Sequence, residues 1–261
     1  MESLIVLKTG SNVIDNPSLL ETVLHDFAAW QTPKILVHGG GKIASELMKK
    51  LGIVPKMVEG RRITDRETLD IVTMVYAGLI NKNVVAKLQS RSCNAIGLTG
   101  VDANMIPATK RPVKDIDYGF VGDLTPGCIS SDVLGMFIKT GLVPVVAPIT
   151  HDGAGSLLNT NADTIASAVA VALAKTFRVR LVFCFEKNGV LRNPDDEHSE
   201  IDFLNEALYQ QYKEEGIITA GMIPKLNNAF AALHSGVDEV RICCPVNLNA
   251  GTSIRVERKN V

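Results

Sequence analysis

Two lysines and one aspartate occupy positions where a charged side chain could act on a phosphate group. Lys8 directly follows the apolar run LIVL, Lys225 follows the loop sequence TAGMIP, and Asp163 lies at the polar start of the apolar segment NADTIASAVAVALAK. An isolated lysine is usually a solvated surface residue, and an aspartate at a helix start is usually a cap. Beside a phosphate, however, a lysine gains roughly 4 kcal/mol from an opposite charge about 4 Å away at an intermediate dielectric.

Glycine-rich stretches follow two of the apolar runs. Gly10 and Ser11 come after LIVLKT, and Gly39, Gly40 and Gly41 come after KILVH. Backbone N–H groups in such turns can face an anion without an intervening side chain, and the dipole of a following helix adds positive charge. Strand-to-helix turns also need glycine for conformational reasons alone, and neither stretch matches the GxGxxG or Walker fingerprint. The pattern indicates a phosphate site but does not by itself distinguish it from an ordinary turn.

A parallel sheet would bring these residues together. Short apolar runs alternate with segments of helical spacing, which is typical of βαβ units with helices on both faces of a parallel sheet. The runs are LIVL from Leu4, ILV from Ile35, VPVVAPI from Val143, LVFCF from Leu181 and VRICC from Val240. The predicted fold is α/β, an open three-layer αβα sandwich with a central, mostly parallel sheet. Ligands bind at the carboxyl ends of such strands, so the lysines and glycines should meet there.

Two helices are clearly marked in the sequence. One begins after Asn16, which can act as its N-cap, with Pro17 in its first turn. Its apolar face repeats at helical spacing through Leu20, Val23, Leu24 and Phe27. The other begins near Asp163, with Asn161 or Asp163 as its cap, and is apolar enough to be buried on most sides. Its end, near Lys175, is where we place the division between two halves, because no linker marks one elsewhere.

Composition limits the classes of protein. The chain has 261 residues, of which 46% are apolar and 21% charged, and a net charge of −1, so it can bury a proper core. This charge balance gives no electrostatic basis for binding nucleic acid, and the longest apolar stretch is about half of a membrane span. The five cysteines contain no CxxC and are expected to be reduced. We therefore expect a cytoplasmic protein without nucleic-acid or membrane partners.

Six motifs, in their order and spacing, carry a family resemblance. They are VLKTG near the N-terminus, VHGGG after the second apolar run, GRRIT from Gly60, INKNVVAKL from Ile80, LLNTNAD from Leu157 and TAGMIPK from Thr219. Together they resemble the acetylglutamate kinases, a branch of the amino acid kinase family, over essentially the whole chain. VHGGG and NAD are shared across the wider family, whereas GRRIT, the Asn81–Lys82 pair and GMIPK favour the acylglutamate branch.

The resemblance implies a kinase. Such an enzyme transfers the γ-phosphoryl group of ATP to the side-chain carboxylate of N-acetylglutamate, or of a related N-acylglutamate, in arginine biosynthesis, with ATP as co-substrate and Mg²⁺ as cofactor. A carboxylate with a pKa of about 4.3 is already ionised at neutral pH, so the reaction needs no general base. It needs positioning and positive charge instead. This fits a sequence whose five histidines form no constellation, and we interpret His38 as structural.

The same resemblance assigns roles to residues of this chain. Lys8 and Lys225 would contact the transferring phosphoryl group from opposite sides, with Asp163 holding both lysines in place. The residues that would bind phosphate are Gly10, Ser11, Gly40 and Gly41. The residues that would bind the acylglutamate are Gly40, Arg62 and Asn159, where Arg62 pairs with the α-carboxylate through its planar fork. The residues that would bind the nucleotide are Glu186, Lys187, Gly189 and Lys225, and no protein ligand to the metal is expected.

The resemblance also predicts how the chain is divided and assembled, and the chain differs from the family pattern at a few positions. Residues 1–175 would bind the acylglutamate and form the dimer, and residues 176–261 would bind ATP. The sequence opens on its first strand, without the N-terminal helix through which arginine-inhibited relatives build a hexamer, which implies a homodimer without arginine feedback. Ser11 stands where the family usually has a second glycine, and Glu186 stands where it usually has aspartate. Arg61, beside Arg62, is interpreted as solvated.

Two alternatives stay open. Another amino acid kinase could use the same phosphoryl-transfer residues on carbamate, aspartate, unacylated glutamate or a nucleotide monophosphate. The presence of Arg62 and Asn159 argues against these acceptors. A catalytically silent sensor could bind ATP or an acylated amino acid, and the departures at Ser11 and Glu186 are its best support. Spacing also leaves the acyl group undecided between acetyl and a larger group such as succinyl, since one or two methylenes change binding by only about 1–3 kcal/mol.

Overall fold

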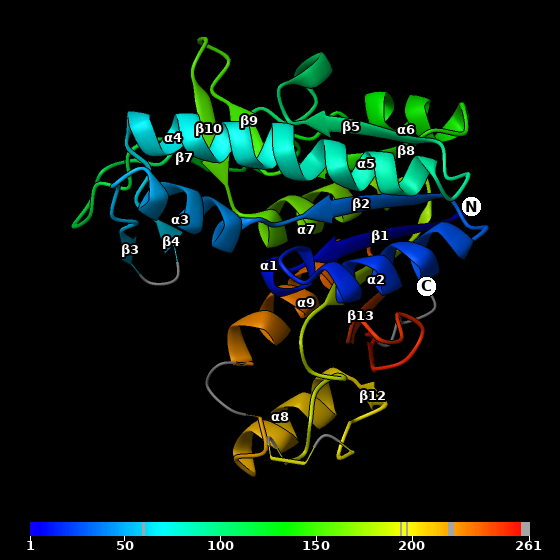
Figure 1. The fold of residues 1–261 in the computed structure, drawn as a ribbon. Helices are drawn as coiled ribbons and strands as arrows, with labels where there is room; N and C mark the ends of the chain where they lie inside the picture. The colour runs from blue at the N-terminus through cyan, green and yellow to red at the C-terminus, as the bar shows by residue number, and fades with distance from the viewer. Residues whose placement is uncertain (59–60, 194, 197, 219–221, 257–261) are drawn as a thin grey trace.

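The central feature of the computed structural model is one eight-stranded sheet (Figure 1). The model describes residues 1–58, 61–193, 195–196, 198–218 and 222–256. The first residue of the GRRIT motif, Gly60, and the first three of TAGMIPK, at 219–221, lie outside the described residues. The rest of both motifs is described, including Arg61, Arg62 and Lys225.

The sheet is almost entirely parallel, as the alternating pattern predicts. In spatial order its strands are β12 (Phe203–Leu204), β14 (Thr252–Ile254), β13 (Glu239–Cys243), β11 (Arg178–Cys184), β1 (Ser3–Thr9), β2 (Lys34–His38), β8 (Val143–Ala147) and β5 (Ala95–Thr99). The β13–β14 pair is antiparallel, and the other neighbouring pairs are parallel. Each of the five predicted strands lies in this sheet, although the run VPVVAPI breaks at Pro148 into β8 and a further strand, β9 (Ile149–His151).

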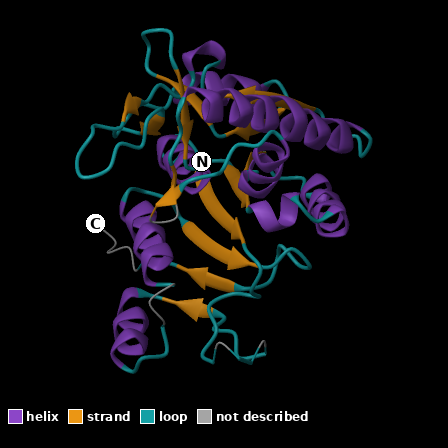
Figure 2. Cartoon of the chain, turned by 60° about the vertical axis from the view of Figure 1, so that its left-hand side comes forward, coloured by secondary structure: helices purple, strands orange, loops and turns teal. Residues whose placement is uncertain are grey.

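Helices cover both faces of the sheet and complete the predicted three layers (Figure 2). One face carries α1 (Ser11–Ile14), α2 (Pro17–Ala29), α3 (Gly41–Lys50), α4 (Arg66–Thr73), the π-helical η1 (Met74–Ile80) and α5 (Asn81–Gln89). The other face carries α6 (Ser131–Lys139), α7 (Ala162–Leu173), α8 (Glu206–Glu214) and α9 (Ile223–His234). The α/β sandwich predicted from the sequence is therefore confirmed.

Two smaller sheets and a short helix lie outside the central sheet, and local sequence patterns did not predict them. A four-stranded sheet has the order β6 (Thr109–Lys110), β7 (Val121–Asp123), β10 (Leu157–Thr160) and β9. The short strands β3 (Met57–Val58) and β4 (Arg61–Arg62) pair with each other, and η2 (Asp102–Asn104) is a single 3₁₀ turn. β10 and β4 matter for function because they carry Asn159 and Arg62.

Helix starts follow the polar residues that the sequence indicates. Asn16 accepts hydrogen bonds from the backbone N–H groups of Ser18 and Leu19 and caps α2. At α7 the cap is Asn161, whose side chain accepts from the backbone N–H of Thr164. Asp163 is therefore not the cap, and its carboxylate can face the edge of the sheet.

The division predicted near Lys175 lies between the end of α7 at Leu173 and the start of β11 at Arg178. Strands before it, from β1 to β5, occupy one half of the spatial order, and strands after it occupy the other half. The border is the β1–β11 pair, in register from Ser3 with Arg178 to Thr9 with Cys184. Hydrophobic packing crosses this border, because Val6 of β1 and Leu181 of β11 belong to the same core cluster.

One helical segment is longer than any single apolar run in the sequence suggests. α4, η1 and α5 continue into one another from Arg66 to Gln89, and by length and composition alone this segment could cross a membrane. Its buried side chains, such as Val72, Val75 and Val84, pack into the core on one face of the central sheet. A buried core helix meets the same criteria of length and composition, so these two properties do not identify the segment as a membrane span.

Gly97 provides a test of how closely α5 must approach β5. A Cβ atom at this position would lie 2.0 Å from Asn81 Oδ1 and 2.7 Å from Lys82 Nζ. Asn81 cannot move away freely, because it is buried and donates through Nδ2 to the carbonyl of Val145 at 2.9 Å. We expect Gly97→Ala to lower the free energy of unfolding by about 1–3 kcal/mol, as overpacking does, measured by urea denaturation.

Gly135→Ala is the matched control for that variant. Gly135 lies inside α6, and a Cβ there would meet nothing within 4 Å. Because alanine is favoured over glycine in a helix interior by up to about 1 kcal/mol, this control should be neutral or stabilising. Equal stability of Gly97→Ala and the wild type would contradict the close approach of α5 to β5.

Candidate active site

The carboxyl ends of the three middle strands gather the residues singled out by the sequence. Thr9 at the end of β1 is in register with His38 of β2 and with Cys184 of β11. Lys8 therefore projects from the middle of the sheet, next to the glycine-rich turn after β2 and the Phe185 segment after β11. This convergence of Lys8, the glycines and the second half of the chain is what a parallel sheet predicts.

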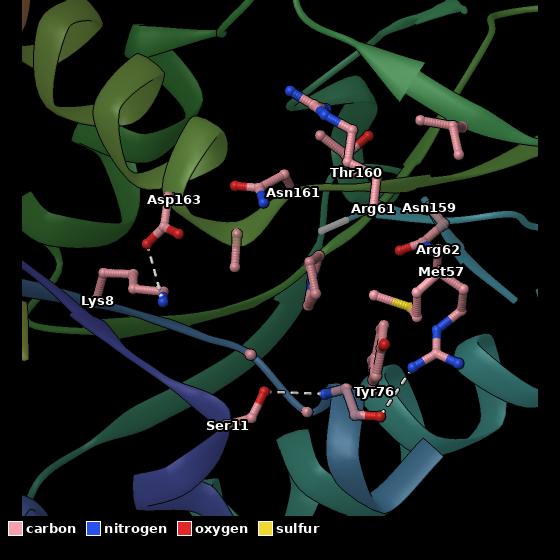
Figure 3. Close-up of a pocket in the computed structure, with 16 residues that line it drawn as sticks. Lys8, Ser11, Met57, Arg61, Arg62, Tyr76, Asn159, Thr160, Asn161 and Asp163 are labelled. Carbon is pink, nitrogen blue, oxygen red and sulfur yellow. Dashed lines mark hydrogen bonds and ion pairs between the residues drawn. The ribbon is translucent and has the colours of Figure 1, made fainter. Parts of the chain in front are cut away.

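Lys8 and Asp163 form an ion pair at this edge of the sheet. Lys8 Nζ lies 2.8 Å from Asp163 Oδ1, and the lysine side chain is only 8% exposed, against 40% for the aspartate. Asp163 stands in the first turn of α7, where a negative charge is also favoured by the helix dipole. The pair gives the buried amino group of Lys8 a carboxylate partner at the cavity shown in Figure 3.

Lys225 approaches the same region from the second half of the chain. Its Nζ lies 4.0 Å from the centre of the Phe185 ring, and Lys8 Nζ lies 5.4 Å from the same centre. Burial lowers the pKa of Lys225; the charges of Asp163 and Glu186 oppose this shift, and that of Lys8 adds to it. The ion pair of Asp163 is with Lys8, so Asp163 contacts one of the two lysines that it is predicted to hold and acts on Lys225 through its charge.

Ser11 connects the two glycine-rich turns. The backbone N–H of Gly41 donates to Ser11 Oγ at 3.1 Å, and the N–H of Gly39 donates to the carbonyl of Thr9 at 3.0 Å. The amide of Gly41, expected to face a phosphate, is therefore directed at a side chain here. Ser11, which the family resemblance marks as a departure from glycine, supplies a hydroxyl that links the turn after β1 to the turn after β2.

Gly40 permits a close approach of the glycine-rich turn to η1. A Cβ atom there would lie 2.3 Å from Ile80 Cδ1 and 3.0 Å from Tyr76 Cδ1. Any larger residue would push the turn away from η1 and out of the cavity, whose lining includes Tyr76 and all three glycines, 39–41. The glycine triplet thus serves close packing as well as access to its backbone.

A first cavity, which we call the acceptor cavity, lies between Lys8 and the small β3–β4 sheet (Figure 3). Arg62 lines it and is largely buried, with Nη2 donating to the carbonyl of Gly41 at 2.9 Å and to Ser45 Oγ at 2.8 Å. Asn159 also lines it and donates through Nδ2 to Thr64 Oγ1 at 3.1 Å. The structure thus brings Lys8, Gly40, Arg62, Asn159 and Asp163 to one cavity, as the sequence predicts.

A second cavity, which we call the donor cavity, lies on the side of the sheet formed by the second half of the chain. Its lining contains Gly10, Ser11 and the four residues expected to bind the nucleotide, namely Glu186, Lys187, Gly189 and Lys225. Gly189 packs against β14, where a Cβ would lie 2.6 Å from Thr252 Oγ1. Ser11 lines both cavities, so they adjoin at the turn after β1.

Sequence reasoning missed two residues of the acceptor cavity. Tyr76 of η1 lies beneath the glycine-rich turn, and burial raises the pKa of its phenol while the nearby Arg62 opposes the shift. Arg61 was interpreted as solvated, but it is half-buried and lines the cavity together with Arg62. Strand alternation places neighbouring side chains on opposite faces, so the sequence offered no signal that both arginines border one space.

His38 is a structural residue, as expected. Its Nδ1 lies 2.8 Å from the carbonyl oxygen of Gly39, which can only accept a hydrogen bond, so Nδ1 carries the proton. Nε2 then accepts from Asn81 Nδ2 at 3.2 Å. Complete burial lowers the pKa of His38 to about 4, so the imidazole is neutral at neutral pH. It fixes the end of β2 to α5 and has no proton to exchange in the cavity.

The acidic side chains at the two cavities are few. Asp163 lines the acceptor cavity and Glu186 lines the donor cavity. Within the described part of the chain, no group of three or more histidine, cysteine, aspartate or glutamate residues could hold a metal ion. A magnesium ion at these cavities would therefore have to keep most of its coordination with phosphate oxygens and water.

The family of the chain follows from comparisons with known proteins. The model of the amino acid kinase family matches residues 3–244, and the chain belongs to this family. It is 57% identical to the acetylglutamate kinase of Cytophaga hutchinsonii over 93% of this chain and 92% of that protein. It is 53% identical to the acetylglutamate kinase of Bacteroides fragilis over 97% of both chains, and 40% identical to that of Methanopyrus kandleri over 91% and 93%.

Solved structures support the fold. A protein of Streptococcus mutans superposes with a TM-score of 0.75 at 28% identity, covering 97% of this chain and 98% of that one. The N-acetylglutamate synthase of Neisseria gonorrhoeae, solved with coenzyme A and N-acetylglutamate, superposes with a TM-score of 0.81 at 21% identity. That match covers 98% of this chain and 60% of the synthase, and at this identity it supports the fold alone.

The neutral His38 should leave a signature in the pH dependence of stability. Because its pKa is about 4 in the folded protein and about 6.5 when unfolded, the unfolded state binds more protons between these values. The stabilisation is therefore complete above pH 6.5 and is lost as the pH falls towards 4, up to roughly 3 kcal/mol. Urea denaturation at pH 7.0, 5.5 and 4.5 should show the free energy of unfolding falling across this window.

His38→Gln tests whether this residue causes the fall. The variant should be less stable at pH 7 because two buried hydrogen bonds change, but its free energy of unfolding should depend less on pH between 6.5 and 4.5. His25→Gln, a change at an exposed residue of α2, should retain the wild-type pH dependence. Parallel pH profiles for wild type and His38→Gln would show that another group is responsible.

Proposed function

We propose that this chain transfers the γ-phosphoryl group of ATP to the side-chain carboxylate of an N-acylglutamate, with N-acetylglutamate as the reference substrate. The observation that carries the proposal is the meeting of two cavities at Ser11, with Lys8 and Lys225 beside one aromatic ring, that of Phe185. The names of the closely similar relatives, acetylglutamate kinases from several organisms, point to the same reaction. Its product, an acyl phosphate, would serve arginine biosynthesis.

The acceptor cavity supplies what an acylglutamate needs. Arg62 would pair with the α-carboxylate, because its guanidinium group lines this cavity and is held there by bonds from Nη2 to Gly41 and Ser45 and from Nη1 to the sulfur of Met48. Asn159 would add a polar contact from β10. The γ-carboxylate would then lie towards Lys8. Because this carboxylate is already ionised at neutral pH, no general base is required. His38 supports this reading, because its buried and neutral ring is committed to Gly39 and Asn81.

The donor cavity would hold ATP with its phosphates towards Ser11. The amides of Gly10 and Gly40 would bind phosphoryl oxygens, and Lys8 and Lys225 would neutralise the charge that develops during transfer. Asp163 would keep Lys8 in position through their 2.8 Å ion pair. Glu186, Lys187 and Gly189 would contact the nucleotide. Mg²⁺ carried by the phosphates would offset part of their negative charge, with Asp163 and Glu186 as the nearby carboxylates.

The cytoplasm is the compartment in which we place this reaction. The reaction consumes ATP, and the five cysteines, including Cys93, Cys184 and Cys243 in the core, are free thiols that suit a reducing environment. Fractionation of cells with an antibody to the chain would test the assignment, and recovery in a membrane or extracellular fraction would contradict it.

Hydroxylamine trapping tests the proposed reaction directly. The enzyme is incubated with Mg-ATP and glutamate, N-acetylglutamate or N-succinylglutamate, and any acyl phosphate is captured as a coloured hydroxamate. We expect a hydroxamate from at least one acylated glutamate and none from glutamate itself. Absence of product from every acceptor, with ATP binding intact by calorimetry, would favour the sensor; a hydroxamate from unacylated glutamate would favour a different acceptor within the family.

Alanine at either lysine should abolish most of the turnover. Removing Lys8 or Lys225 takes away a positive charge aimed at the transferring group, so we expect kcat to fall by roughly 10²- to 10³-fold. Lys139→Ala, at an exposed position in the last turn of α6, should retain wild-type kcat. Circular dichroism would establish that both active-site variants are folded. Retention of full kcat by either variant would remove that lysine from the mechanism.

We further propose that the chain forms a homodimer through its first half. Met74 and Leu79 on η1 are more than half exposed although they are large and apolar, and they belong to the long helical segment 66–89. Burying such side chains against a second copy would remove apolar surface from water. Sedimentation equilibrium should give a dimer for the wild type and a monomer for the double variant Met74→Asp, Leu79→Asp. A monomeric wild type, or a hexamer, would contradict the proposal.

A further inference from the structure

The acceptor cavity contains one more cationic side chain than the proposed reaction uses. Lys8 serves the γ-carboxylate and the phosphoryl group in that proposal, and Arg62 serves the α-carboxylate. Arg61 lines the same cavity but has no part in binding an acylglutamate whose acyl group is a plain acetyl. The inference below rests on the proposed function and concerns the portion of the substrate that Arg61 would meet.

Arg61 and Arg62 border the cavity from different directions. Figure 3 shows the guanidinium group of Arg62 turned towards the glycine-rich turn, where Gly41 and Ser45 accept its hydrogen bonds. In the same view the side chain of Arg61 projects the other way, on the side of Thr160. A substrate anchored by its α-carboxylate on Arg62 would therefore have a second, separate cation available on another side.

Arg61 is not neutralised by the described residues of the protein. Asp163 is the acidic residue in the described lining of the cavity, and its ion pair is with Lys8. Two other arginines do have partners. Arg111 donates to the carboxylate of Asp123, and Arg66 lies over the ring of Phe120 at 5.2 Å. Half-buried Arg61 has no such partner among the described residues, and its side chain borders the cavity.

We infer that Arg61 binds a carboxylate at the far end of the acyl group, so that the substrate is a glutamate carrying a dicarboxylic acyl group. N-Succinylglutamate is the compact example, with three carboxylates for three cationic positions: Lys8 for the γ-carboxylate, Arg62 for the α-carboxylate and Arg61 for the acyl carboxylate. An acetyl group ends in a methyl, which cannot accept a hydrogen bond from a guanidinium group and would leave Arg61 without a partner.

The acyl carboxylate is bound in this arrangement and is not phosphorylated. The γ-carboxylate oxygen attacks the γ-phosphorus of ATP, the bond to the bridging oxygen breaks, and ADP leaves with that electron pair. Arg61 holds the third carboxylate away from Lys8 and Lys225, so the substrate presents one oxygen nucleophile to the phosphoryl group. Arg61 is therefore a specificity residue, and its removal should act on the choice of acyl group.

The kinetic test compares two acylated substrates with the wild-type enzyme. Initial rates of hydroxamate formation are measured over a range of N-acetylglutamate and N-succinylglutamate concentrations at saturating Mg-ATP. We expect kcat/KM to favour the succinyl substrate by roughly 10- to 100-fold, the range of a hydrogen bond between charged groups. Turnover of N-acetylglutamate alone, or a preference for it, would overturn the inference while leaving the proposed function intact. Turnover of neither substrate would overturn both.

Variants of Arg61 assign the preference to that side chain. Arg61→Gln should lower the succinyl-to-acetyl ratio of kcat/KM by roughly 10- to 100-fold, mainly through the KM for the succinyl substrate, and Arg61→Lys should retain part of the ratio. Lys56→Gln removes an exposed charge just before β3, outside the lining of the cavity, and should leave the ratio at its wild-type value. An equal loss with both substrates after Arg61→Gln, seen in kcat, would place Arg61 with the phosphoryl group and overturn the inference.

Discussion

The burial of Lys8 at the end of the central strand is the constraint on which the rest of the site depends. A buried ammonium group is costly unless it is paired, and Asp163 provides that pair at 2.8 Å. For Asp163 to reach it, α7 must begin directly above the carboxyl end of β1, which requires Asn161 to cap the helix two residues earlier. The cap, the ion pair and the position of the cation in the cavity are therefore parts of one arrangement.

That arrangement suits a reaction in which charge is the main difficulty. An ionised carboxylate must approach a polyanionic nucleotide, so the site has to supply positive charge and fixed geometry, whereas proton transfer is unnecessary. The groups at the sheet edge match this requirement. Lys8 and Lys225 both lie near Phe185, whereas the histidine at the end of β2 is buried, neutral and bonded on both ring nitrogens. A site built for acid–base catalysis would need an accessible group that titrates.

Five of the eight strands of the central sheet could be predicted from the sequence, because they depend on local signals, whereas the meeting of Lys8 with Asp163 was implied by the family resemblance. Apolar runs mark strands, and Asn16 with Pro17 marks the start of α2, within a few residues of chain. β10 and the β3–β4 pair escaped prediction because two- to four-residue strands owe their structure to partners elsewhere. Asn159 of β10, for example, is in register with Val121 and with Ile149. Likewise, the placement of both Arg61 and Arg62 at one cavity depends on the pairing of β4 with β3, which no local pattern indicates.

Ser11 shows how a departure from a family pattern can be reconciled with the site. A glycine would allow the turn after β1 more conformations, and its loss is the main sequence feature in favour of a silent sensor. In the structure, the serine hydroxyl accepts from the amide of Gly41, so the side chain joins the two turns that border the acceptor and donor cavities. An in-line transfer requires those two turns to keep a fixed separation within a fraction of an ångström. A hydrogen bond between them supports that geometry, and the substitution therefore argues for an active kinase at least as well as it argues for a sensor.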